Sequence, residues 1–342
     1  MFNNNFKISN LNVSNSSKTI VIAEVGINHE GSFSNCIKLI NNAHKCGADL
    51  IKVQTANPSL SYKKNTKSYK IFKRSSLTNE ETFNLYKYCK KKNIKLFSTF
   101  DRGNYEFFKK IRQPCYKISS SLFYDFKLIN DILRFNKPVL ISTGVSDLED
   151  IDSLIKLIKF KKNKKIILLH CLSLYPTPKS DINLSRINYL KNKYRIIPGF
   201  SDHTIGYDAS LASIHYGAKI LEKHFTLDNK RAGYDHKISL DPKNFKTMVK
   251  KLKENEEMAG IHNYEIFNNS KFKKINEVIR SYQIIKDQKK NTFIKKDHLR
   301  LVRTNEKKNI LKFSKIIKKI FGKKISKDIR TGEYLKYSFF HN

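Results

Sequence analysis

The sequence predicts an α/β protein, a (β/α)8 TIM barrel followed by a small β-rich domain. Between about residues 18 and 255, eight short apolar runs alternate with stretches of helical period, which is typical of an eight-stranded parallel barrel. After residue 265 the segments become short, basic and strand-like, with no long helix. We therefore expect a barrel domain over residues 1–265, and a linker with a C-terminal domain over residues 266–342.

The eight predicted strands are short and rich in apolar and β-branched residues, as buried parallel strands are. They are 19–24, 50–55, 94–99, 115–119, 138–143, 165–170, 194–201 and 218–224. A doubly wound open sheet is the alternative. It normally uses fewer strands, and no G-x-G-x-x-G motif follows the first strand.

Helical patterns separate these strands. Apolar residues recur at helical spacing from Cys36 to Ala43, and Gly47 follows as a stop signal. Thr78 and Glu81 form a capping box before the next helix. Further helical patterns cover 147–160, 206–216 and 243–255.

The C-terminal domain contains two similar segments, each with an apolar pair, a lysine-rich turn and a short apolar run. They lie within 276–303 and 322–340. Between them, 307–324 has the pattern of a basic amphipathic helix, which either packs its Ile and Phe side chains inward or lies on a membrane surface.

The chain is strongly basic, with 67 Lys and Arg against 30 Asp and Glu and a formal net charge of +37. Such a charge is typical of proteins that bind nucleic acids or membranes. The lysines are spread along the whole chain, so we expect no specific nucleic-acid partner and no membrane. A basic, non-enzymatic nucleic-acid-binding protein is the alternative.

The cysteines indicate a reducing compartment, because the five of them are scattered and form no C-x-x-C pair. The N-terminal residues are polar and unlike a secretory signal. No apolar run reaches the roughly 18 residues of a membrane span. We therefore expect a cytoplasmic protein.

Polar residues gather at the ends of the predicted strands. In such a barrel the carboxyl ends of all strands meet at one rim, where active sites form. The rim residues are Glu24, Lys52, Gln54, Thr99, Lys117, Ser120, Ser142, Ser173, Tyr175, Ser201, His203, Glu222 and His224, with Asp235 shortly after the last strand.

Two kinds of chemistry meet in this set. Lys52, Lys117 and the short hydroxyl side chains supply the donors and the positive charge that a phosphate needs. His203 and His224, at matching positions on neighbouring strands, suit manganese, iron or zinc rather than calcium. The carboxylates suit acid–base chemistry. A single serine or histidine at a strand end is usually structural, so the prediction depends on their convergence.

Neighbouring residues of an extended chain point to opposite sides. Ser201 and His203 can therefore face the site together, while Asp202 points away and orients a neighbour or caps the next helix.

Nine motifs occur in order along the chain: IAEVGINHEGS, GADLIKVQT, FSTFD, YKISS, LISTG, HCLSLYPTP, GFSDHTIG, LEKHFTLD and GYDHKISLDPKNF. They resemble the sialic acid synthase family, N-acetylneuraminate synthase-like transferases that condense phosphoenolpyruvate with N-acetylmannosamine or a related N-acyl amino sugar. The resemblance covers about residues 18–255. The tail resembles the family's C-terminal SAF (antifreeze-like) domain more loosely.

The resemblance implies a role for each rim residue. His203 and His224 look like the ligands of a divalent metal, manganese first, with magnesium or cobalt as alternatives. The residues that look like phosphoenolpyruvate contacts are Lys52, Thr99, Lys117, Ser120, Ser142, Ser173 and Ser201, although Ser173 stands where some members have asparagine. Those that look like sugar and water contacts are Glu24, Gln54, Tyr175, Glu222 and Asp235, and Glu24, Asp235 and Glu222 are the catalytic candidates.

The resemblance also implies a domain-swapped homodimer, in which the SAF domain of one chain caps the barrel of the other and supplies an arginine. Arg303 lies where the family's KRPGNG loop provides that residue. The proline and glycines of the loop are missing here, and Asn291 stands where a turn glycine is common.

The acceptor sugar is left open between N-acetylmannosamine, a legionaminate-type diacetamido sugar and a phosphorylated mannosamine. The motif AEVGINHEG makes the pseudaminate branch a weaker candidate. Octulosonate synthesis, another phosphoenolpyruvate condensation, fits less well, because those barrels lack the SDHT and EKHFT motifs and the SAF tail.

Overall fold

The computed structural model describes residues 2–99, 102–260, 280–303, 320 and 322–340. The chain divides into two compact units, Met1–Ile261 and His262–Asn342, and each is described by itself. The predicted boundary at 265 and most of the predicted amphipathic helix over 307–324 lie outside the described residues.

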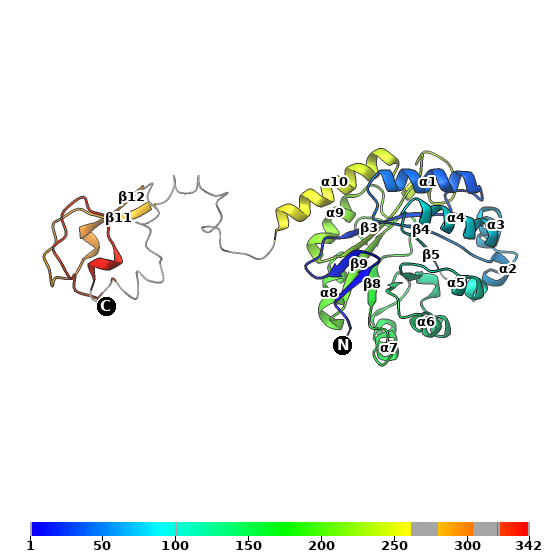
Figure 1. Cartoon of the computed structure of the whole chain (residues 1–342), viewed down its shortest axis with the longest axis horizontal. Coiled ribbons are helices and arrows are strands. Elements are labelled where there is room, and N and C mark those ends of the chain that lie inside the picture. Colours follow the sequence, from blue (N-terminus) through cyan, green and yellow to red (C-terminus); the bar gives the residue numbers. More distant parts are fainter. Residues whose placement is uncertain (1, 100–101, 261–279, 304–319, 321, 341–342) are drawn as a thin grey trace. The chain divides into compact units, whose positions relative to one another are not determined.

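Eight parallel strands form the wall of the first unit, which confirms the predicted (β/α)8 barrel (Figure 1). The strands pair in the order β5–β4–β3–β10–β9–β8–β7–β6. A parallel bridge between Thr99 and Lys117 joins the two outermost strands and closes the barrel. The strands are β3 (Ile20–Gly26), β4 (Leu50–Val53), β5 (Leu96–Ser98), β6 (Tyr116–Ile118), β7 (Val139–Ser142), β8 (Ile166–His170), β9 (Ile197–Asp202) and β10 (Ile220–His224).

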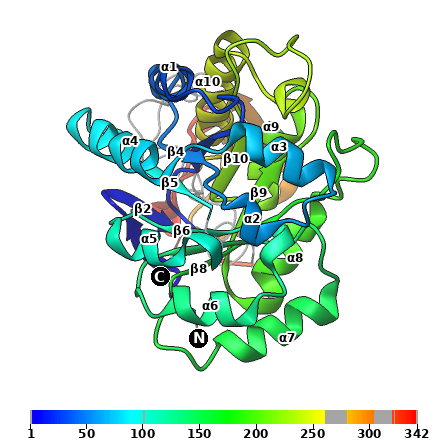
Figure 2. The same ribbon diagram turned by 90° about the vertical axis from the view of Figure 1, so that its right-hand side faces the viewer.

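Helices cover the outside of the barrel (Figure 2). The Thr78–Glu81 capping box is present, since each residue's side chain accepts a hydrogen bond from the other's backbone N–H. No helix in the described part of the chain is long and apolar enough to cross a membrane. The helices are α1 (Phe33–Lys45), α2 (Pro58–Ser61), α3 (Lys67–Ser75), α4 (Asn79–Lys91), α5 (Tyr105–Lys110), α6 (Phe126–Leu133), α7 (Leu148–Ile158), α8 (Ser185–Tyr194), α9 (Asp208–Ser213) and α10 (Pro242–Ala259).

The seventh strand starts later than predicted, at Ile197 instead of residue 194. Tyr194 is the last residue of α8, and Arg195 follows in the left-handed conformation with φ 49°. This conformation ends the helix and prevents an extended start at 194.

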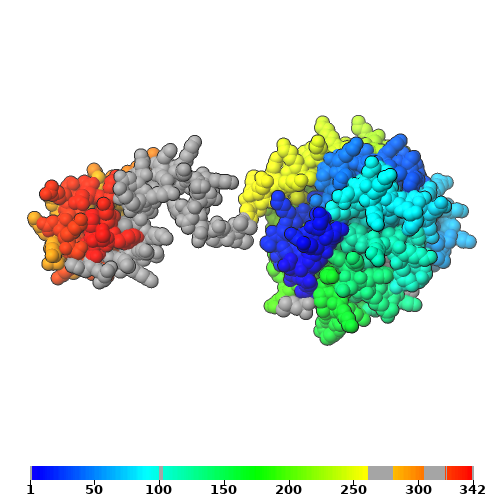
Figure 3. All heavy atoms as spheres, viewed as in Figure 1, coloured from blue at the N-terminus to red at the C-terminus, as the bar shows by residue number. Residues whose placement is uncertain are grey.

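An N-terminal hairpin that the sequence analysis did not predict packs against the core inside the barrel. Strands β1 (Asn5–Ile8) and β2 (Leu11–Ser14) pair antiparallel. Their apolar side chains Phe6, Ile8 and Val13 belong to the same buried cluster as Ile20 and Leu50, which start barrel strands. Figure 3 shows the N-terminal residues in dark blue at the surface of the barrel unit. The hairpin therefore covers the amino-terminal end of the barrel.

Side-chain alternation divides the barrel interior into layers. On β3, Ile20 and Ile22 belong to the interior cluster, and Glu24 follows on the same face of the strand. On β10, Ile220 lies in that cluster, and Glu222 and His224 follow in the same way. The interior is therefore apolar at the amino-terminal end and polar at the carboxyl end.

Asp202 points away from the interior, as predicted, and forms a buried ion pair with Lys223. Lys223 Nζ lies 3.3 Å from Asp202 Oδ2, and both side chains are fully buried. The Asp202 carboxylate also accepts hydrogen bonds from the Thr204 N–H and from the Ser210 hydroxyl of α9. Lys223 donates to the Thr204 carbonyl at 2.6 Å. This network fixes the start of the β9–α9 connection.

The second unit is small and β-rich. Strands β11 (Arg280–Ile284) and β12 (Leu299–Arg303) pair antiparallel. Reciprocal hydrogen bonds join the two similar segments predicted within 276–303 and 322–340. Asp328 Oδ1 accepts a hydrogen bond from the Lys290 N–H at 2.7 Å, and Asp287 Oδ1 accepts one from the Thr331 N–H at 2.7 Å. Its core contains Ile284, Ile294, Ile320, Ile325, Ile329, Leu335, Phe339 and Phe340. The identity of this unit as a SAF domain stays a prediction.

We expect Asp202→Asn to lower the free energy of unfolding by about 3–5 kcal/mol, because it leaves a buried lysine without a counter-charge. Chemical denaturation measures this loss. The control is Asp208→Asn, which breaks an exposed pair with Lys179 and should cost no more than about 1 kcal/mol. Equal, small losses in both variants would show that the buried pair does not stabilise the barrel.

Candidate active site

A cavity of about 500 Å³ opens at the carboxyl end of the barrel strands. It brings together thirteen of the fifteen predicted site residues, from all eight strands or the loops that follow them. They are Glu24, Lys52, Gln54, Thr99, Lys117, Ser120, Ser142, Ser173, Tyr175, Ser201, His203, Glu222 and His224.

A buried network of ion pairs forms the floor of this cavity. Lys52 Nζ lies 3.1 Å from Glu24 Oε2 and 3.0 Å from Glu222 Oε1. Lys117 Nζ approaches the same Glu222 oxygen at 3.4 Å, and the Ser201 hydroxyl donates to it at 2.8 Å. The predicted phosphate-binding cations and the predicted acid–base carboxylates are therefore one connected group.

Strand register explains this arrangement. Glu24 of β3 pairs with Lys52 of β4 on one side and with His224 of β10 on the other. Glu222 of β10 pairs with Ser201 of β9. Because paired residues of parallel strands point to the same face, their side chains converge inside the barrel.

The network gives its two carboxyl groups different acidities. Burial raises the pKa of Glu24 to about 7, although the nearby Lys52 opposes this shift. Burial also opposes ionisation of Glu222, but Lys117 and Lys52 outweigh it and hold the pKa of Glu222 well below its usual range. Glu222 is thus a fixed anion, whereas Glu24 exchanges its proton near neutral pH.

Two neutral imidazoles lie beside the network. Burial lowers the pKa of His203 to about 4 and that of His224 well below its usual value, the latter with help from His203 and Lys52. His203 Nδ1 lies 2.6 Å from the Leu172 carbonyl. It therefore carries the proton, and Nε2 keeps its lone pair. The ring centroids of His203 and His224 are 5.6 Å apart.

Several polar atoms around this cavity have no hydrogen-bond partner in the part of the chain that the structure describes. Ser142 Oγ, Glu222 Oε2 and His224 Nδ1 are all buried without a hydrogen bond. Buried polar atoms are nearly always paired, so such a group indicates a place for a ligand, an ion or water. No cluster of three or more His, Cys, Asp or Glu side chains suitable for a metal occurs among the described residues.

Asp235 lies on the loop after β10, outside the main cavity. It lines an adjoining cavity of about 720 Å³ that also contacts Gln54 and Tyr175. Its Oδ2 is 3.6 Å from His224 Nδ1, and burial raises its pKa to about 6. Asn28 accepts from the Asp235 N–H at 3.2 Å and so positions this loop.

Arg303, the remaining predicted site residue, is exposed at the end of β12 in the second unit. Its capping role stays a prediction.

Three other buried histidines of the barrel have local partners. His170 Nε2 lies 2.6 Å from the Ile182 carbonyl. His236 bridges Thr226 Oγ1 and Glu30 Oε1 at 2.8 and 3.0 Å. His29 Nδ1 accepts from the Gly31 N–H. None of the three lines the 500 Å³ cavity.

Two features in and beside the cavity wall were not predicted from the sequence. Tyr62 and Phe72 line it with their rings stacked at 4.8 Å; the only signal was the long connection between β4 and α4. Gly144 brings its N–H to within 3.0 Å of Ser120 Oγ. A Cβ at Gly144 would lie 2.7 Å from Ser173 Oγ and 2.8 Å from Ser120 Oγ, so only glycine allows these hydroxyls to lie so close to the backbone.

Comparison with known proteins agrees with this geometry. Residues 39–264 match the NeuB family, and the chain belongs to that family, which confirms the predicted sialic acid synthase resemblance. It is therefore an enzyme, and the non-enzymatic alternative is wrong.

Full-length relatives and a solved structure support the assignment. The chain is 32% identical to pseudaminic acid synthase of Campylobacter jejuni, over 96% of this chain and 98% of the relative. It is 30% identical to N,N'-diacetyllegionaminic acid synthase of the same species, over 91% and 98%. The N-acetylneuraminic acid (sialic acid) synthetase from Leptospira borgpetersenii, crystallised with citrate, superposes with a TM-score of 0.75 at 30% identity, over 81% of this chain and 96% of that chain.

We expect Glu24→Gln to change how stability depends on pH. The folded pKa of Glu24, about 7, exceeds its ordinary value of 4.5. The wild-type protein therefore binds more protons than the unfolded chain in this window. Glu24 makes wild-type stability fall as pH rises from 4.5 through 7, by up to about 1.4 kcal/mol per pH unit. The free energy of unfolding of the variant does not show this decrease, so the variant becomes more stable relative to the wild type as pH rises over the same range.

Denaturation of the metal-free proteins at pH 5 and pH 7 measures the difference. Glu257→Gln on the exposed side of α10 is the matched control and should show no such trend. A constant difference between Glu24→Gln and wild type at both pH values would contradict the raised pKa.

Proposed function

We propose that this enzyme condenses phosphoenolpyruvate with N-acetylmannosamine or a related N-acyl amino sugar to give a nonulosonate and inorganic phosphate. The observation that carries the proposal is the cavity in which buried cations and one buried serine hydroxyl, without a hydrogen bond among the described residues, adjoin two neutral imidazoles. The names of the relatives, synthases of sialic-acid-type sugars, agree with it.

In this reaction C3 of phosphoenolpyruvate forms a bond to the aldehyde carbon of the open-chain sugar. The electrons of the C2–C3 double bond form this new bond, so positive charge develops at C2. Water then adds to C2. The C2–O bond to the phosphate group then breaks, and phosphate leaves with the electron pair.

The cations and hydroxyls suit the phosphate and carboxylate of phosphoenolpyruvate. Lys52 and Lys117 are held in place by Glu222, and Ser142 Oγ is a buried hydroxyl that makes no hydrogen bond with any described residue. Donors fixed before the substrate arrives stabilise developing charge without reorganisation. Thr99, Ser120, Ser173 and Ser201 complete the proposed binding set.

The residues also fit a divalent metal, manganese in the first instance. His203 and His224 are neutral and line the cavity, and neutral imidazole is the form that binds metals. His224 Nδ1 makes no hydrogen bond among the described residues, which agrees with a further partner at this place. A metal held here would polarise the aldehyde oxygen of the sugar as a Lewis acid.

Glu24 is the proposed base that takes a proton from the attacking water. Its pKa of about 7 allows it to accept a proton at neutral pH. Glu222 is a poorer candidate, because two lysines and Ser201 already stabilise its anion. Asp235, with a pKa of about 6, is the second candidate. Gln54 donates to Glu24 at 2.9 Å and, with Tyr175, is proposed to contact the sugar.

We also propose, from the family resemblance, that the enzyme is a domain-swapped homodimer in the cytoplasm, with Arg303 of one chain acting at the barrel of its partner.

We expect His203→Ala to abolish metal-dependent turnover and to reduce manganese binding. Phosphate release measures the first effect, and metal analysis after dialysis measures the second. His215→Ala, at an exposed histidine outside the barrel interior, is the control and should keep both properties. Full activity of His203→Ala without bound manganese would overturn the metal assignment.

Phosphate release with a panel of sugars should identify the acceptor. The panel contains N-acetylmannosamine, its 6-phosphate and the two diacetamido hexoses that lead to legionaminate and pseudaminate. Because the pseudaminate and legionaminate relatives are 32% and 30% identical to the chain, overall similarity does not choose between these branches. We expect one sugar to be strongly preferred, and no phosphate release with any of them would contradict the proposed reaction.

A further inference from the structure

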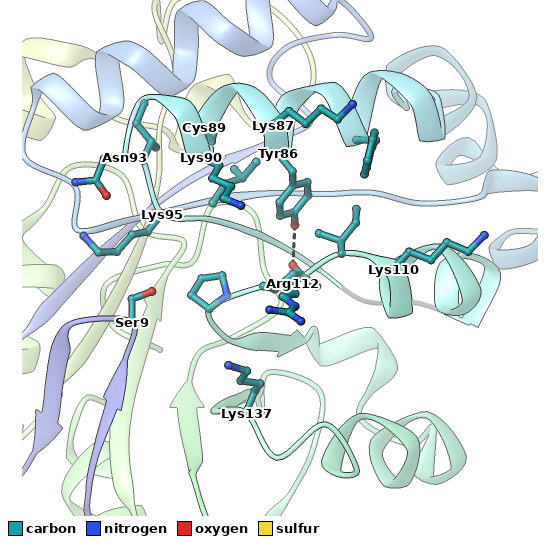
Figure 4. A pocket seen from close by; sticks show the side chains of 16 residues that line it. Ser9, Tyr86, Lys87, Cys89, Lys90, Asn93, Lys95, Lys110, Arg112 and Lys137 are labelled. Carbon is teal, nitrogen blue, oxygen red and sulfur yellow. Dashed lines mark hydrogen bonds between the residues drawn. The ribbon is translucent and has the colours of Figure 1, made fainter.

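A second cavity, of about 620 Å³, lies at the opposite end of the barrel from the candidate active site (Figure 4). Its lining comes from α4, from residues 93–96 and 110–114, which lead into β5 and β6, and from Lys137, just before β7. Ser9, in the turn of the N-terminal hairpin, also lines it. These segments all precede barrel strands or belong to the hairpin at that end, so the cavity is separate from the catalytic mouth.

This cavity concentrates positive charge. Six of its sixteen lining residues are cationic and none is acidic, compared with 67 Lys and Arg in 342 residues overall. Figure 4 shows Arg112 in the middle of the view, with Lys90 of α4 above it and Lys137 below. The six cations are Lys87, Lys90, Lys95, Lys110, Arg112 and Lys137.

The cations at the two ends of the barrel differ in their partners. Lys52 and Lys117 at the catalytic end are neutralised by Glu24 and Glu222. None of the six cations around the second cavity forms an ion pair with a carboxylate in the part of the chain that the structure describes. Unpaired like charges around a concave surface create a positive potential that attracts anions.

Gln113, which lines the cavity, is held in a fixed orientation. Gln113 is only 3% exposed, and its Oε1 accepts from the Tyr86 hydroxyl and from the Ser98 N–H, both at 2.7 Å. These bonds fix the amide orientation, and Gln113 Nε2 is buried without a hydrogen bond to any residue that the structure describes.

One wall of the cavity is apolar. Ile94, Ile111 and Pro114 line it. Phe83 is 41% exposed at its edge, and Lys87 Nζ lies 4.5 Å from the centre of the Phe83 ring.

We propose that this cavity binds a small polyphosphate, a ligand with two or more linked phosphate groups. Lysine and arginine are the side chains that recognise phosphate, and arginine can do so through two hydrogen bonds at once. Its volume lies in the range of small-molecule sites. Figure 4 shows Lys90 and Lys137 on either side of Arg112, so linked phosphates could contact cations from α4 and from two loops, which a single phosphate could not do. The binding is independent of the proposed reaction.

Calorimetry with inorganic tripolyphosphate tests the proposal. It is done in EDTA, so that chelated metal plays no part, and with saturating phosphoenolpyruvate, so that the cations of the catalytic end are occupied. We expect tripolyphosphate to bind, and we expect the affinity to fall as the salt concentration rises. The dissociation constant should increase about tenfold or more in Lys90→Glu/Arg112→Glu, which reverses two charges of the cavity.

The matched control is Lys38→Glu/Lys243→Glu, which makes the same change in net charge at exposed positions of α1 and α10. It should change the dissociation constant by no more than about twofold. Lys90→Gln/Arg112→Gln is the milder variant if charge reversal impairs folding, which circular dichroism reports. Equal loss of affinity in the cavity and control variants, or absence of binding in the presence of phosphoenolpyruvate, would overturn the proposal.

A parallel titration with ATP distinguishes the source of the phosphates. Tighter binding of ATP than of tripolyphosphate, lost in Phe83→Ala, would support a nucleotide whose base lies on the apolar wall. Equal affinities, unaffected by Phe83→Ala, would support inorganic polyphosphate. Binding of neither ligand would contradict the site.

Discussion

The active-site end of the barrel depends on one interaction, the ion pairing of Lys52 with two buried carboxylates. Its ammonium group is 3.1 Å from Glu24 and 3.0 Å from Glu222, and all three side chains are nearly inaccessible to water. A buried charge is tolerated only when a partner compensates its lost hydration. Lys52, Lys117, Glu24 and Glu222 therefore form one unit, above an apolar interior that cannot solvate any of them.

This network decides which group can do which chemistry. Glu222 receives two lysines and a serine hydroxyl on one oxygen, so it stays ionised and organises the cations. Glu24 shares only Lys52 and a hydrogen bond from Gln54, so burial dominates and its pKa rises. Two glutamates on neighbouring strands thus differ in acidity because of the number of their charged partners. The same burial keeps His203 and His224 neutral, the form in which imidazole can bind a metal.

The lysines and arginines of the barrel unit lie in two different kinds of surroundings. In the active-site cavity the two lysines, Lys52 and Lys117, are buried and paired with carboxylates. At the amino-terminal end, Lys90, Arg112, Lys137 and their neighbours surround a cavity without any acidic lining residue. Lysines that are spread evenly along the sequence are therefore distributed unevenly in space, because successive loops between helices and strands meet at the same end of a barrel.

The sequence by itself determined the barrel, the carboxyl-end location of most site residues and the outward direction of Asp202. These features depend on local periodicity and on the rule that parallel strands end at one rim, so a linear pattern is sufficient. Tertiary structure alone decided that Lys52 pairs with both Glu24 and Glu222, that Asp202 meets Lys223, and that the hydroxyls of Ser120 and Ser173 lie close to Gly144. It also decided that an N-terminal hairpin packs against the barrel interior and that Arg112 and Lys137 line one cavity. Each of these depends on contacts between residues far apart in the chain, and such contacts follow from strand register and packing, which no short stretch of sequence encodes.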